Sequence, residues 1–170
     1  MAKAAPIPGL EADTLFGAAA AAAVEVRAGE VFAHSEGILD VSDIERVHAM
    51  RVATRRLRAA LEVFGACFPK KEHRRVLREV KALADALGER RDPDVAIEEL
   101  EKVGRKLAKA DAAGVASLVA VHRAEQARGN EVLSAALDSA AEARLADRLM
   151  ALAESARAVD VEAAEDEVAS

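Results

Sequence analysis

The residues best suited to chemistry in this chain form a stripe of positive charge at helical spacing. Segment 48–58 reads His-Ala-Met-Arg-Val-Ala-Thr-Arg-Arg-Leu-Arg, and its opposite face is apolar. At about 100° per residue, one face gathers a histidine and three arginines: His48, Arg51, Arg55 and Arg58. A guanidinium stays charged at any working pH and donates paired hydrogen bonds to phosphate oxygens. The stripe therefore predicts a binding surface for a polyanion.

A second run of basic residues follows within the next predicted helix. Its members recur at i, i+3, i+4, i+7 and i+10: Lys71, Arg74, Arg75, Arg78 and Lys81. Solvated faces normally mix both signs, and like charges at i, i+4 cost stability unless an anion neutralises them. Two antiparallel helices could align both stripes in one electropositive groove. Two ordinary solvated faces are the alternative interpretation.

Positive charge is concentrated in one block of an acidic protein. The 170 residues carry a formal net charge of −6, yet residues 42–91 hold thirteen Lys and Arg against seven Asp and Glu. Such asymmetry indicates an anionic partner for the basic block. Residues 159–170 carry five acidic side chains and no basic one, which predicts a disordered, solubilising tail.

The elements that must position these stripes are helices. Ala, Leu, Val, Glu and Arg dominate, prolines number four, and Trp and Tyr are absent. Capping and turn signals come from Ser42 with Glu45 (a capping box), Gly88 (a left-handed C-terminal cap) and Asp92 (an N-cap). With periodicity they predict about six helices, near 13–35, 42–68, 69–87, from 93 past 100, 113–137 and 139–158. Short connections then predict an all-α, up-and-down antiparallel bundle.

The chain length fits a single domain. We expect a flexible N-terminus at 1–12, a helical domain at 13–158 and the acidic tail at 159–170. A lone cysteine rules out an internal disulfide, and no apolar stretch approaches the roughly 20 residues needed to cross a bilayer. These features predict a cytoplasmic protein without a membrane partner.

Three segments carry a resemblance to a known family: His48-x-x-Arg51-Val52-x-x-Arg55-Arg56-Leu57-Arg58, the basic helix after it, and Leu87-Gly88-x-x-Arg91-Asp92-x-Asp94-Val95. Together they resemble the CHAD family, the conserved histidine α-helical domain, over about residues 10–130. The resemblance implies a helical bundle that binds inorganic polyphosphate and associates with polyphosphate granules. Carried over by position, the implied contacts are His48, Arg51, Arg55, Arg56, Arg58, Arg74, Arg78, Lys81 and, at the turn, Arg91.

After residue 137 the chain departs from the family pattern. Full-length members resemble two related four-helix halves, whereas this chain shows no second His-x-x-Arg motif and only Arg144, Arg148 and Arg157 in that region. It resembles a shortened member carrying the first half. Either one half-site suffices, with weaker binding, or two copies form a homodimer that covers an otherwise exposed apolar face.

No catalytic, metal or cofactor site is expected. The chain lacks a Gly-x-x-x-x-Gly-Lys loop and the Glu-x-Glu-x-Lys signature of a CYTH triphosphatase, and its four histidines show no ligand-pair spacing. Non-catalytic polyphosphate binding is therefore the expected function. Nucleic-acid backbone binding is the main alternative, disfavoured because aromatic content is 2%, all Phe. A structural or protein-interaction module is the other alternative.

Overall fold

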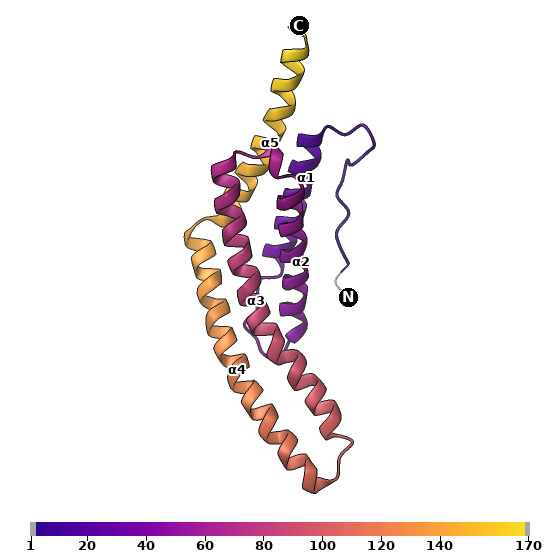
Figure 1. Ribbon diagram of the computed structural model, residues 1–170, viewed down its shortest axis with the longest axis vertical. Helices are drawn as coiled ribbons and strands as arrows, with labels where there is room; N and C mark the ends of the chain where they lie inside the picture. Colours follow the sequence, from indigo (N-terminus) through magenta and orange to yellow (C-terminus); the bar gives the residue numbers. More distant parts are fainter. Residues whose placement is uncertain (1–2, 169–170) are drawn as a thin grey trace.

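The computed structural model describes residues 3–168, without the side chains of 109–111 and 160–168. Within this part of the chain there are five α-helices, one short 3₁₀ helix and no strand (Figure 1). In order they are α1 (Phe16–Ala33), α2 (Ile44–Val63), η1 (Gly65–Cys67), α3 (Lys70–Gly104), α4 (Lys109–Glu142) and α5 (Leu145–Val168). The predicted all-α fold is confirmed.

The helices pack antiparallel around an aliphatic core. α1 lies between α2 and α5, and α3 packs against α2 on one side and α4 on another. Buried alanines of α1, including Ala21 and Ala28, let neighbouring helices approach closely. Met50, Leu57 and Leu61 of α2 are also buried, at most 1% exposed. Burial of this apolar stripe turns the opposite, arginine-bearing face of α2 outward.

The predicted break between the third and fourth helices was wrong. Both belong to α3, which runs for 35 residues with Pro93 inside it. Gly88 is not a left-handed cap, since Gly9 and Gly37 are the described glycines with positive φ. Asp92 lies within the helix and caps nothing. A proline in a helix interior costs about 3 kcal/mol, so other contacts must stabilise α3 at this point.

A buried polar cluster between α3 and α4 supplies those contacts. The Arg90 guanidinium pairs with the Asp94 carboxylate, and both side chains are essentially inaccessible to solvent. Gln126 Nε2 of α4 donates to Asp94 Oδ1 (2.6 Å), and Arg90 Nε donates to Oδ1 of Asn130 (3.0 Å). These bonds exist only if residues on both sides of Pro93 share one helix. Tertiary contacts therefore override the local turn signals.

The two long helices form a hairpin that extends beyond the other helices (Figure 1). The two helices approach each other closely at Gly129 of α4. A Cβ there would lie 3.0 Å from the Arg90 Cα and 3.0 Å from the carbonyl oxygen of Glu89. Pro93 has no N–H to donate to that carbonyl. The absence of a side chain at Gly129 thus sets the spacing of the hairpin.

The start of α2 also differs from the predicted capping box. The helix begins at Ile44 with Asp43 as N-cap, and no side chain caps it by a hydrogen bond. Instead, the Ser42 hydroxyl donates to Asp40 Oδ1 (2.7 Å), within the preceding loop. A local side-chain hydrogen bond has therefore replaced the cap. The helix ends at Val63, and η1 follows where the prediction extended it to residue 68.

Residues near the N-terminus form hydrogen bonds with α1, and α5 continues as a helix toward the C-terminus. The Ala5 amide donates to Glu30 Oε1 (2.6 Å), and Arg27 Nη1 donates to the Ala5 carbonyl (2.9 Å). At the other end, α5 has helical backbone to Val168, inside the segment where disorder is predicted. Residues 1, 2, 169 and 170 lie outside the described part, and the domain boundaries stay predictions.

None of the described helices combines the length and apolar character required to span a membrane.

Candidate functional site

A groove of about 270 Å³ lies between α2 and α3. Its walls contain all four members of the first predicted stripe, with few other residues: His48, Arg51, Val52, Arg55 and Arg58 from α2, and Ala84 and Asp85 from α3. The stripe therefore forms one concave surface. Because helix geometry alone sets the spacing of its members, the groove presents its cations in a fixed row. We refer to these seven residues as the groove.

Two of the three groove arginines have no counter-ion in the described part of the chain, and Asp85 is the carboxylate that also lines the groove. Arg51 and Arg55 are exposed and form no ion pair with a described residue. At one end of the groove, Glu62 is shared by Arg58 Nε (3.7 Å) and Lys81 Nζ (3.4 Å). This shared carboxylate links α2 to α3 and brings Lys81 to the groove. Two exposed cations without counter-ions are suited to bind an external anion.

A second basic surface lies at the beginning of α3. It surrounds a hollow of about 490 Å³ whose other lining residues are Pro69 and Glu72. Its cations, which we name the α3 patch, are Lys71, Arg74, Arg75 and Arg78. Of the predicted contacts on this helix, Arg74 and Arg78 thus belong to the patch. The predicted single groove is divided into two adjacent basic surfaces.

The structure does not bring two of the predicted contacts into either surface. Arg56 points toward α1, where its Nη1 lies 4.0 Å from Glu30 Oε1. Arg91 was predicted at a turn between two helices, and that placement was wrong, because it lies inside α3, where it is 9% exposed. Its Nη1 is 3.9 Å from Asp94 Oδ2. Both guanidiniums therefore face carboxylates of the protein.

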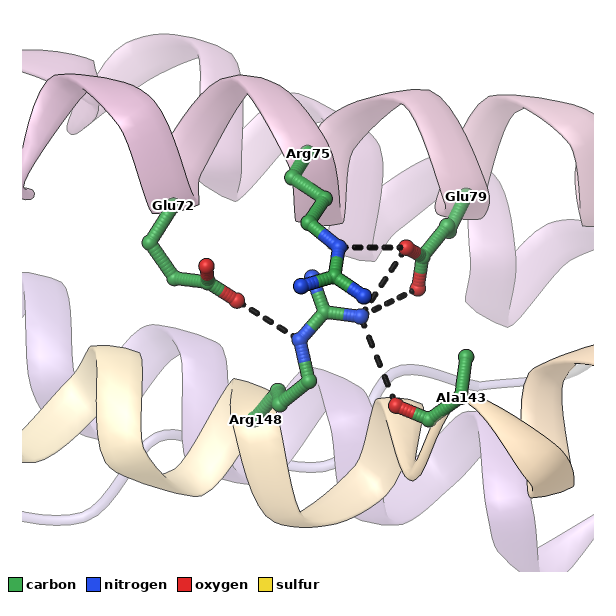
Figure 2. Close-up of polar contacts among 5 residues, drawn as sticks. All are labelled: Glu72, Arg75, Glu79, Ala143 and Arg148. Atoms are coloured by element: carbon green, nitrogen blue, oxygen red, sulfur yellow. Dashed lines mark hydrogen bonds and ion pairs between the residues drawn. The ribbon is translucent and has the colours of Figure 1, made fainter.

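Sequence reasoning missed the role of Arg148 in α5. Figure 2 shows this side chain reaching between Glu72 and Glu79 of α3. Its Nε donates to Glu72 Oε1 (2.6 Å), and its Nη1 donates to both Glu79 oxygens (2.9 and 2.8 Å). Burial opposes its charged form, but the hydrogen bonds to the carboxylates prevail and raise the pKa of Arg148. No local signal marks the contact, because 76 residues separate Arg148 from Glu72.

Another arginine of α5 forms a similar clamp elsewhere. Arg157 donates from Nη1 and Nη2 to the two carboxylate oxygens of Glu25 in α1, each at 2.8 Å. The hydrogen bonds from Arg157 hold the pKa of Glu25 below its ordinary value. Two arginines thus fix α5, one to α3 and the other to α1.

Comparison with known proteins gives one finding. The family model described as the CHAD domain matches residues 22–170. The match includes the groove and the α3 patch, and it continues through α5, beyond the residues on which the sequence resemblance rests. Neither a curated protein nor a solved structure matches the chain.

Proposed function

Because the chain belongs to the CHAD domain family, we propose that its groove binds inorganic polyphosphate without catalysing a reaction. One observation carries the proposal. His48, Arg51, Arg55 and Arg58 line a single concave surface, and two of these arginines have no counter-ion among the described residues. Family membership indicates which anion to test first.

The binding mechanism would be electrostatic capture. A helical rise of about 1.5 Å per residue spaces Arg51, Arg55 and Arg58 by about 6 and 4.5 Å along α2. Each guanidinium can donate two hydrogen bonds to one phosphate group. Successive phosphates of a linear chain would then meet successive arginines, so chain length would be the recognised property. Release of counter-ions from the polyanion makes such binding strongly dependent on salt.

Nucleic acid fits these surfaces less well. A duplex is wide and would extend past the groove over a protein whose net charge is −6. Single strands usually stack on aromatic side chains, and the four Phe residues are the only large aromatics of the chain. A narrow, densely charged polyphosphate avoids both difficulties. A cytoplasmic location at polyphosphate granules would follow from this binding.

The test removes charge from the groove and, separately, from positions outside both basic surfaces. Arg55→Glu with Arg58→Glu reverses two groove charges. Lys3→Glu with Arg128→Glu makes the same charge change at two exposed cations outside the groove and the α3 patch, which form no ion pair with a described residue. We expect the groove variant to lose at least about tenfold in affinity for long-chain polyphosphate, against a small loss in the control variant.

Circular dichroism should show unchanged helix content in both variants. A folded groove variant that binds polyphosphate as the wild type does would contradict the proposal. Equal losses in both variants would indicate a general effect of net charge and would also contradict it. Binding of duplex DNA in preference to polyphosphate would favour the nucleic-acid alternative.

We further propose that two copies associate through the hairpin. Near its far end, four apolar side chains are between 41% and 55% exposed: Val103, Leu107, Leu118 and Val121. Exposed apolar patches commonly mark protein–protein contacts. Light scattering coupled to gel filtration should give a dimer mass for the wild type and a monomer mass for Val121→Asp. A monomeric wild type at micromolar concentration would contradict this proposal.

A further inference from the structure

More cations of the α3 patch are without an ion pair to a described residue than the sequence of α3 predicts. Residues 70–81 contain six Lys and Arg, with Glu72 and Glu79 as the acidic members. Neither Lys71 nor Arg74 forms an ion pair with a described residue, and the same holds for Arg78. On an ordinary solvated helix, these two glutamates would pair with the lysines and arginines around them.

Arg148 of α5 binds both glutamates, Glu72 and Glu79. It lies between them, as Figure 2 shows, and its side chain is 17% exposed. It binds each carboxylate at 2.8 Å or less, whereas the Arg75 Nε lies 3.5 Å from Glu79. Charge-assisted pairs of that geometry persist because partial burial limits screening by water. Glu72 and Glu79 are thus engaged mainly by Arg148 of α5, and among the patch cations Arg75 is the one that forms an ion pair with either of them.

The patch is also continuous with the groove. Lys81 shares Glu62 with Arg58 at the end of the groove, and Arg78 is the next cation along α3, one helical turn away. From Lys81 to Lys71 the helix rises about 15 Å, similar to the distance from His48 to Arg58 along α2. A polyanion that fills the groove and is longer than it would meet Lys81 and then the patch.

The family resemblance already implies polyphosphate contacts at Arg74 and Arg78. We propose that Lys71 and Arg75 extend this contact surface over the whole α3 patch and that Arg148 is its positioning residue. Arg148 holds Glu72 and Glu79 so that they do not repel a bound anion. The inference rests on the proposed function of the groove and deepens it. Short chains bind the groove, and long chains bind both surfaces, so the patch makes the protein selective for chain length.

The first experiment removes patch charge. Lys71→Gln with Arg75→Gln neutralises two patch cations outside the groove. Calorimetric titration compares tripolyphosphate with a chain of about 100 phosphates for wild type and variant. The ratio of long-chain to short-chain affinity should fall about tenfold, and the salt dependence of long-chain binding should weaken by about two counter-ions. An unchanged ratio in the folded variant would overturn the inference.

The second experiment tests the role of Arg148 with a matched control. Arg148→Met frees Glu72 and Glu79, while Arg157→Met makes the same substitution and charge change on the same helix but frees Glu25 of α1. Arg157→Met also frees Glu154. Long-chain affinity should fall about fivefold more in Arg148→Met than in Arg157→Met, since the carboxylates that Arg148 releases lie on the helix of the patch and face the anion. Adding Glu72→Gln and Glu79→Gln to Arg148→Met should restore the affinity.

Rescue separates positioning from a merely structural role, because neutralising two carboxylates without changing the size of their side chains cannot repair lost packing. Equal losses in the two methionine variants, or no rescue by the glutamine substitutions, would overturn the role of Arg148. If Arg148→Met does not fold, the ratio of long-chain to short-chain affinity measured for Lys71→Gln with Arg75→Gln still decides whether the patch binds polyphosphate. A wild type that binds polyphosphate of no length would refute the proposed function itself. If the wild type binds long chains with an affinity that does not depend on the patch cations, only the inference is refuted.

Discussion

Replacement of Gly88 by alanine tests whether α3 is one continuous helix. A Cβ at Gly88 would meet no atom within 4 Å, and its φ is not positive. Alanine is favoured over glycine in a helix interior by about 0.5–1 kcal/mol. We therefore expect Gly88→Ala to raise the free energy of unfolding by about that amount. If Gly88 were a left-handed cap, the same change would cost about 1–2 kcal/mol.

Gly129→Ala provides the opposite expectation on the partner helix. Its propensity gain is the same, but the new Cβ would lie 3.0 Å from the Arg90 Cα and the Glu89 carbonyl oxygen. Both are backbone atoms, so α3 and α4 must move apart. Overpacking of this kind costs about 1–3 kcal/mol. Subtracting a gain of about 1 kcal/mol leaves a net loss of up to about 2 kcal/mol.

Urea unfolding followed by circular dichroism measures both variants, with unchanged m values as the condition for comparing midpoints. Gly114→Ala is the matched control, because a Cβ there also meets no atom within 4 Å. It should stabilise the protein as Gly88→Ala does. A lower free energy of unfolding for Gly88→Ala would refute the continuous α3. A change of the free energy of unfolding in the same direction for Gly88→Ala and Gly129→Ala would refute the close contact of α3 with α4.

Two further predictions concern charged groups within the bundle. Asp94→Ala should lower the free energy of unfolding in urea by about 3–5 kcal/mol, because it leaves the buried Arg90 without its counter-charge; a loss below about 1 kcal/mol would contradict the buried pair. Hydrogen bonds from Arg157 lower the pKa of Glu25 below 4.5, so this carboxylate stabilises the fold above that pH, and the contribution disappears as pH falls through the lowered pKa. Glu25→Gln should therefore make thermal stability fall less steeply below about pH 4.5, and an unchanged acid slope would contradict the assignment.

The fold class and the arginine face of α2 could be predicted because both depend on local periodicity. Apolar residues at helical spacing, such as Met50 and Leu57, place α2 on the core. The arginine face opposite them follows from the same geometry. Short connections then favour antiparallel neighbours. No long-range information is needed for either conclusion.

The predicted break within α3 was wrong because tertiary contacts override local signals there. Gly88 and Pro93 are turn signals in isolation, yet both lie inside α3. The contacts that keep the helix intact come from Gln126 and Asn130 of α4. Local sequence signals contain no information about partners on another helix. They therefore predicted two helices where the structure has one.

The candidate site also has a part that local spacing predicts and a part that depends on tertiary contacts. His48 to Arg58 share one helix, and their common surface follows from spacing alone. Whether Arg56 faces the groove or α1 depends on where Glu30 lies, which the spacing does not give. Arg148 is further still from its partners, 76 residues from Glu72. Its contacts with Glu72 and Glu79 became visible only with the helices in place.

The most direct test of the account is calorimetric titration of the full chain with long-chain polyphosphate at two salt concentrations, with duplex DNA as comparison. The account predicts tight binding of polyphosphate that weakens steeply with salt, since several counter-ions are released, and weak binding of DNA. Absence of polyphosphate binding at low salt would contradict it, and the arginine face would then serve the structure or a protein partner.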